Sequence, residues 1–114
     1  MPFLKIQTST ELAETAARSL ASRASSLVAS QLGKPERYVM VSVENNPAMQ
    51  FAGSTDPLAY LELKSIGLPE SSTGDVSRAL CELVTSETGI KPERIYIEFA
   101  DAARKMWGWN GSTF

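Results

Sequence analysis

The sequence contains no histidine and only one cysteine, Cys81, among its 114 residues. The absence of histidine removes the commonest general base and the commonest zinc ligand, and it excludes Ser-His-Asp and Cys-His catalytic sites. A single cysteine excludes an intrachain disulfide and a Cys-x-x-Cys redox site. Any proton transfer catalysed by this chain therefore needs another base. We expect Cys81 to be a buried residue of a helix.

Long apolar runs and concentrations of positive charge are also missing. Polar residues interrupt every apolar stretch, and the N-terminus lacks the basic segment and apolar core of a secretory signal. The net charge is −2, and the Lys and Arg residues are scattered rather than gathered into a stripe that could neutralise phosphates. We therefore expect a cytoplasmic protein whose main partner is neither nucleic acid nor a membrane.

The length predicts a single domain that spans residues 1–114. A domain of this size leaves a large share of its surface unburied. Because 43% of the residues are hydrophobic, the chain has a physical reason to associate with copies of itself.

An internal repeat divides the chain into two halves. The sequence Lys-Pro-Glu-Arg at 34–37 recurs 57 residues later at 91–94, and strand-like runs follow at 38–44 and 95–99. The same offset pairs residues 4–6 with 61–63 as two earlier strands. Between these strands, apolar residues recur at helical spacing over 11–32 and from Val76 to Val84, and Gly33 and Gly89 supply the helix stops. Each half is predicted to be strand, helix, strand.

Two such units predict an α/β (α+β) fold: a four-stranded sheet with two helices on one face. No helix is left to cover the other face, which we expect to carry apolar side chains that pack against further subunits. The tail at 105–114 includes Trp107, Trp109 and Phe114. It is too short for a layer of its own, and we predict a short edge strand that reaches a neighbouring subunit.

Six blocks follow one another in a characteristic order and spacing. They are Met1-Pro2, Gly33-Lys34-Pro35 with Tyr38, Phe51-x-Gly53-Ser54 with Pro57, Ser65-Ile66-Gly67, Pro92-x-Arg94-Ile95-Tyr96-Ile97, and Gly108-Trp109-Asn110-x-Ser112-Thr113-Phe114. Together they resemble the macrophage migration inhibitory factor family of the tautomerase superfamily over the whole chain. The resemblance implies a homotrimer and a keto–enol tautomerase for phenylpyruvate-like 2-oxo acids and dopachrome-like compounds, without a metal or an organic cofactor.

The resemblance implies that Pro2 is the catalytic base once Met1 has been removed. Removal frees a secondary amine, and an apolar pocket beside a cation would lower the pKa of that amine toward neutrality. If Met1 is retained, the nitrogen of Pro2 is an amide and the base is lost. Lys34 matches a residue that holds the substrate carboxylate, but a lysine directly after a helix stop also interacts favourably with the helix dipole. Both interpretations of Lys34 stay open.

Further positions match residues of the family pocket. The backbone N–H of Ile66 matches a second contact to the carboxylate, and Tyr96 matches a pocket residue contributed across a subunit boundary. Tyr38, Trp109 and Phe114 match aromatic positions that serve either the pocket or the assembly.

Glu98 and Trp107 depart from the vertebrate members of the family. Glu98 replaces an asparagine that donates a hydrogen bond to the substrate, and an ionised carboxylate cannot donate. It would repel an anionic substrate unless a cation such as Lys34 offsets it. Trp107 replaces a smaller aliphatic residue at the rim of the pocket, where it narrows the slot or offers a stacking surface.

A second function from a different class stays open. The chain could be a trimeric interaction protein, cytokine-like or ligand-sensing, with a vestigial pocket. Glu98 favours this alternative, whereas Pro2 and Lys34 favour the enzyme. The sequence names neither a receptor nor a physiological substrate.

Overall fold

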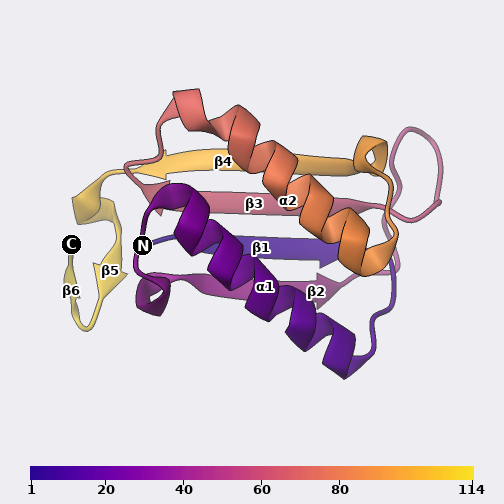
Figure 1. Cartoon of the computed structure of the whole chain (residues 1–114), viewed down its shortest axis with the longest axis horizontal. Helices are drawn as coiled ribbons and strands as arrows, with labels where there is room; N and C mark the ends of the chain where they lie inside the picture. The colour runs from indigo at the N-terminus through magenta and orange to yellow at the C-terminus, as the bar shows by residue number, and fades with distance from the viewer.

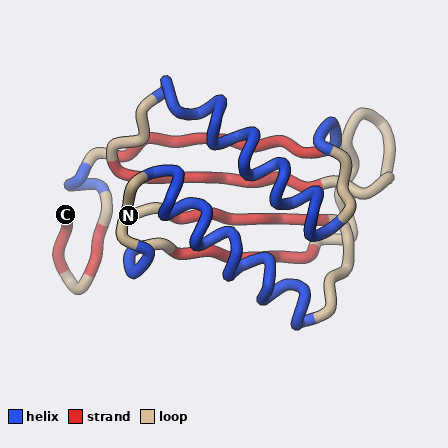
Figure 2. Tube along the Cα trace, viewed as in Figure 1, coloured by secondary structure: helices blue, strands red, loops and turns tan.

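A computed structural model describes all 114 residues and contains a four-stranded sheet with two helices on one face (Figures 1 and 2). The sheet has the order β2-β1-β3-β4. Its strands are β1 (Phe3–Thr8), β2 (Met40–Asn45), β3 (Ala59–Ile66) and β4 (Ile95–Ala102), and the helices are α1 (Glu14–Leu32) and α2 (Thr73–Thr88). Both β-α-β units and the α+β class are therefore confirmed.

The direction of strand pairing decides which segments meet. Within each unit the helix returns the chain to the end where it started, so β1 pairs with β2, and β3 with β4, in parallel. The units join through β1 and β3, which are antiparallel, with Phe3 opposite Lys64 and Thr8 opposite Ala59. As a result β1 and β2 begin at the end of the sheet where β3 and β4 finish. The two Lys-Pro-Glu-Arg segments, which lie just ahead of β2 and β4, are at opposite ends.

The hydrophobic core lies between the sheet and the helices. Alternation along the strands turns every second side chain toward the helices, and these inward residues include Leu4, Ile6, Leu61 and Leu63. The helices contribute residues at helical spacing, namely Leu20, Ala24, Val28, Val76, Leu80 and Val84. No helix of the structure is both long and apolar enough to span a membrane. The cytoplasmic location stays a prediction.

Several boundaries differ from those predicted. Helix α1 begins at Glu14 rather than residue 11, and β2 begins at Met40 because residues Glu36–Tyr38 form a short 3-10 turn, η1. Cys81 lies in α2 as predicted but is half-buried, since it follows the inward-facing Leu80 by one position and so points to the side. Partial burial raises the pKa of its thiol, which keeps it protonated and unreactive at neutral pH.

The uncovered face of the sheet is polar along its middle, so the predicted apolar side chains are found only toward its two ends. Lys5 and Glu62 lie opposite each other there, with Nζ and Oε2 3.9 Å apart, and Lys64 lies at the same distance from that oxygen. Alternation accounts for this, because the apolar residues of β1 and β3 point toward the helices and leave polar ones on the other side. Larger apolar side chains on the uncovered face occupy its two ends, with Phe3 and Met40 at one end and Tyr60 and Tyr96 at the other.

The C-terminal tail forms a hairpin beside the N-terminus (Figure 1). After the short turn η4 (Arg104–Met106), strands β5 (Gly108–Trp109) and β6 (Ser112–Thr113) pair antiparallel. The predicted edge strands are thus present, and in this chain they pair with each other rather than with the main sheet. Contact of the tail with a neighbouring subunit stays a prediction.

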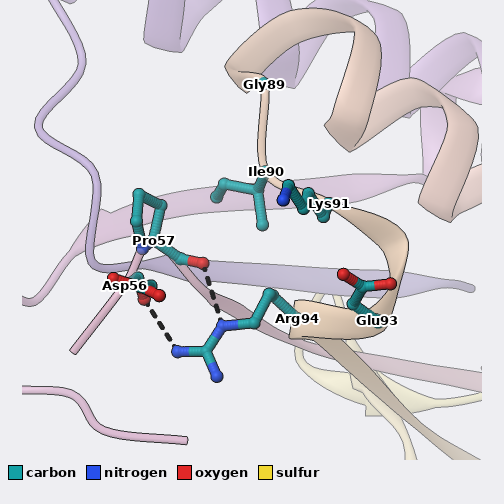
Figure 3. A pocket seen from close by; sticks show the side chains of 7 residues that line it. All are labelled: Asp56, Pro57, Gly89, Ile90, Lys91, Glu93 and Arg94. Atoms are coloured by element: carbon teal, nitrogen blue, oxygen red, sulfur yellow. Dashed lines mark hydrogen bonds between the residues drawn. The ribbon is translucent and has the colours of Figure 1, made fainter. Parts of the chain in front are cut away.

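Arg94 fixes the long loop that leads into β3. Its guanidinium donates hydrogen bonds to the carbonyl oxygens of Phe51 (2.7 Å), Ser54 (3.1 Å), Asp56 (2.8 Å) and Pro57 (3.4 Å). Figure 3 shows the last two of these bonds beside a cavity of about 290 Å³. The guanidinium carbon also lies 5.2 Å from the centre of the Phe51 ring. One side chain therefore determines the path of the loop.

Replacing Arg94 with alanine should lower the free energy of unfolding by about 2 kcal/mol, because hydrogen bonds from a charged donor are lost and their acceptors are left without that donor. Urea denaturation at fixed protein concentration measures this change. Arg18→Ala is the matched control, since Arg18 is exposed and pairs only with Glu14 one helical turn away. Equal effects of the two substitutions would contradict a special role for Arg94.

Candidate active site

A cavity of about 220 Å³ lies at the end of the sheet where β1 and β2 begin. It is bounded by the N-terminus, by η1 with the start of β2, and by the C-terminal hairpin. Its lining is mostly hydrophobic and consists of Met1, Pro2, Phe3, Arg37, Tyr38, Val39, Met40, Trp107, Gly108, Trp109 and Phe114. Because β1 and β2 are parallel, the N-terminus and the turn η1 lie at the same end of the sheet. Strand β4 finishes at that end, so the C-terminal tail that follows it lies there too.

Pro2 is a fully buried residue of this cavity. Its carbonyl oxygen accepts a hydrogen bond from the N–H of Met40 at 3.0 Å, which extends the pairing of the first two strands by one residue. The terminal amine in this structure belongs to Met1. Burial and, to a lesser extent, the positive charge of Lys34 lower the pKa of that amine. The surroundings of the N-terminus therefore favour a neutral amine.

Five aromatic residues line the same cavity: Phe3 at the start of the chain, Tyr38, and Trp107, Trp109 and Phe114 of the tail. The ring of Tyr38 meets Trp109 and Phe114 edge to face, at centroid distances of 5.6 and 6.0 Å, and these two rings stack on each other at 5.6 Å. Trp107 accepts a hydrogen bond at its carbonyl from the N–H of Phe114, which closes the hairpin. The structure thus places Tyr38, Trp107, Trp109 and Phe114 in one cavity with Pro2, and their roles in substrate binding or in assembly stay predictions.

Arg37 is the only charged side chain in the lining, and it was not among the predicted site residues. Its guanidinium carbon lies 4.7 Å from the centre of the Tyr38 ring, and the guanidinium makes no hydrogen bond or ion pair. The repeat contained a signal for it, because Arg37 occupies the same position in the first Lys-Pro-Glu-Arg segment as Arg94 does in the second. Phe3, Val39 and Met40 were also missed, since their place in the cavity depends on strand pairing.

Four predicted site residues do not line this cavity in a single chain. Lys34 is half-buried after the helix stop, and Ile66 is buried at the last position of β3, at the same end of the sheet. Tyr96 lies at the opposite end, where the residue is 63% exposed and its ring centroid is 4.5 Å from that of Phe51. Glu98 is exposed near the middle of the uncovered face. The roles of these four residues stay predictions.

Tyr60, on the uncovered face, is not a candidate base. Its hydroxyl donates a hydrogen bond to Glu62 at 3.1 Å. Partial burial, the bond to Glu62 and the negative charges of Glu62 and Glu98 raise the pKa of Tyr60 to about 12. The phenol therefore stays protonated at neutral pH.

Known proteins resemble this chain along its whole length. A family model described as macrophage migration inhibitory factor (MIF) matches residues 1–114. A macrophage migration inhibitory factor homolog of Brugia malayi is 40% identical, over 100% of this chain and 99% of that protein.

Solved structures give the same result. The crystal structure of a macrophage migration inhibitory factor homologue from Prochlorococcus marinus has a TM-score of 0.93 and 45% identity, and the match covers 98% of both chains. The macrophage migration inhibitory factor of Toxoplasma gondii matches with a TM-score of 0.93 and 30% identity, over 98% of this chain and 99% of that one. With the family model, the relative and these folds in agreement, the chain belongs to the macrophage migration inhibitory factor family of the tautomerase superfamily.

Proposed function

We propose that this chain is a keto–enol tautomerase of aromatic 2-oxo acids of the phenylpyruvate type, with Pro2 as general base after removal of Met1. One observation carries the proposal: in a chain without histidine, Pro2 is fully buried in an aromatic cavity. Burial and the charge of Lys34, which lower the pKa of the present terminal amine, would act on the amine of Pro2 one residue further along.

The reaction is a proton shift between carbon and oxygen. The neutral amine of Pro2 takes a proton from C3 of the oxo acid, and the electron pair of the broken C–H bond forms the double bond between C2 and C3. The π electrons of the C2 carbonyl move to its oxygen, which then receives the proton of the prolinium, directly or relayed by a water molecule, so that the neutral amine is restored. The aromatic lining suits the ring of the substrate. No cofactor is needed, because no electrons are transferred to or from the substrate.

We further propose that the active form is a homotrimer whose pockets lie between subunits. Tyr96 is exposed on the edge strand β4, at the end of the sheet opposite Pro2, so only a second copy can bring it to the cavity. Large apolar side chains of the uncovered face gather at its two ends, which suits contacts between the unlike ends of neighbouring sheets.

Blocking the amine of Pro2 should abolish the activity. An alanine inserted between Met1 and Pro2 makes the proline nitrogen an amide, and loss of a general base should reduce the rate by a factor of about 10² or more. Pro2→Gly keeps a primary amine and should retain part of the activity. Phenylpyruvate turnover is followed by ultraviolet absorbance, with intact mass confirming removal of Met1. If the alanine-extended protein turns over phenylpyruvate as fast as the protein without Met1, Pro2 is not the base. If the protein without Met1 gives a rate no higher than that in buffer alone, the result would favour the interaction-protein alternative.

Lys34→Ala should shift the pH profile of kcat/KM upward. The ammonium of Lys34 lowers the pKa of the terminal amine, so its loss raises that pKa, and the neutral base then appears only at higher pH. Lys91→Ala is the matched control, because Lys91 holds the equivalent position of the repeat at the other end of the sheet. An unchanged profile in Lys34→Ala would leave Lys34 with the helix-dipole role only.

Subunits that are defective in different ways should complement each other. The alanine-extended protein lacks the base and Tyr96→Ala lacks the proposed partner residue, so a refolded mixture should regain activity that neither has alone. Sedimentation at micromolar concentration should show a trimer for each protein and for the mixture. A stable monomer, or a mixture no more active than the sum of its parts, would contradict a shared pocket.

A further inference from the structure

The two Lys-Pro-Glu-Arg segments are equivalent in the repeat, yet their arginines have different surroundings. Each arginine ends or lies within a 3-10 turn ahead of a strand, η1 in the first unit and η3 (Pro92–Arg94) in the second. Arg94 donates to four carbonyl oxygens of the loop before β3. Arg37 donates to none and has no acidic partner. The same motif therefore supports the loop at one end of the sheet and leaves a free guanidinium at the other.

The free guanidinium of Arg37 is held beside an aromatic cavity rather than dispersed in solvent. Its carbon lies 4.7 Å from the centre of the Tyr38 ring, and that ring is fixed by edge contacts to Trp109 and Phe114. The nearest acidic neighbour in sequence, Glu36, is engaged with the hydroxyl of Ser26 at 3.4 Å. No Asp or Glu lines the cavity. Within one chain, an anion that enters this cavity meets a guanidinium whose N–H groups are not engaged by any other protein group.

A planar guanidinium matches a carboxylate in geometry, because two parallel N–H groups can bond both oxygens. The rings beside it offer faces to an aromatic group attached to that carboxylate. We propose that Arg37 binds the carboxylate of an aromatic acid at the mouth of the cavity, which makes it a specificity-determining residue. This inference takes its substrate class from the proposed function. Lys34 does not line the cavity of a single chain, and its own role is tested separately by the pH profile of Lys34→Ala.

Binding of a matched pair of ligands tests the inference without requiring turnover. The pair is 3-phenylpropanoate and 3-phenylpropanamide, which share a ring and a chain but differ in charge, and quenching of Trp107 and Trp109 fluorescence reports binding. Arg37→Gln should weaken binding of the acid by a factor of about 10 or more while changing that of the amide by less than a factor of about 2, since one charged hydrogen-bond donor is lost. The affinity of Arg37→Lys for the acid should lie between those of the wild type and Arg37→Gln, because lysine keeps the positive charge but lacks the two parallel N–H donors of a guanidinium.

Two controls distinguish loss of the Arg37 contact from a general effect of removing an arginine and from the effect of Lys34. Arg18→Gln removes an exposed arginine of α1 and should leave both affinities unchanged. In activity assays Arg37→Gln should raise KM for phenylpyruvate without the pH shift expected of Lys34→Ala. Equal loss of acid and amide binding, no loss of either, or a wild type that binds neither compound would overturn the proposal. If the wild type binds the acid through Arg37 but fails to turn over phenylpyruvate, the proposed function fails and this inference stands.

Discussion

Antiparallel pairing of β1 with β3 is the constraint on which the rest of the structure depends. Within each β-α-β unit the two strands are parallel, so both strands begin at the same end of the sheet. Joining the units antiparallel reverses the second one, so the N-terminus and the tail after β4 meet at the same end of the sheet. The cavity around Pro2 exists because of that meeting, since its walls come from residues near both ends of the chain.

The same constraint lets the two ends of the sheet serve different purposes although they derive from one repeated motif. At one end Arg94 supplies charged hydrogen bonds to a loop whose carbonyl groups need donors. At the other end Arg37 has no such loop beside it, and aromatic side chains of the tail surround Tyr38 instead. A structural arginine and a candidate ligand-binding arginine thus arise from the same position of the repeat.

The alternation of side chains along the strands determines which parts of the uncovered face can be buried in an interface. Its middle carries Lys5 and Glu62, and Lys64, which lies opposite Phe3, completes a charged cluster whose burial against an apolar surface would be unfavourable. Aromatic side chains are confined to the ends of the face. A trimer built on the ends of the sheet would leave the charged middle hydrated, and it would also bring Tyr96 toward the cavity of a neighbour.

The sequence by itself determined the order of strands and helices, the helix stops and the family, because periodicity, glycine positions and short motifs are local properties. It also predicted that Pro2 and the tail aromatics matter. The apolar content of the chain as a whole did not predict the charged middle of the uncovered face, although Lys5 in the alternating pattern of β1 already indicated it. Only the tertiary structure decided that Arg37 and Met40 line the cavity with Pro2 while Tyr96 lies at the far end. The physical reason is that strand direction and register are fixed by contacts between residues distant in sequence, and no local pattern encodes them.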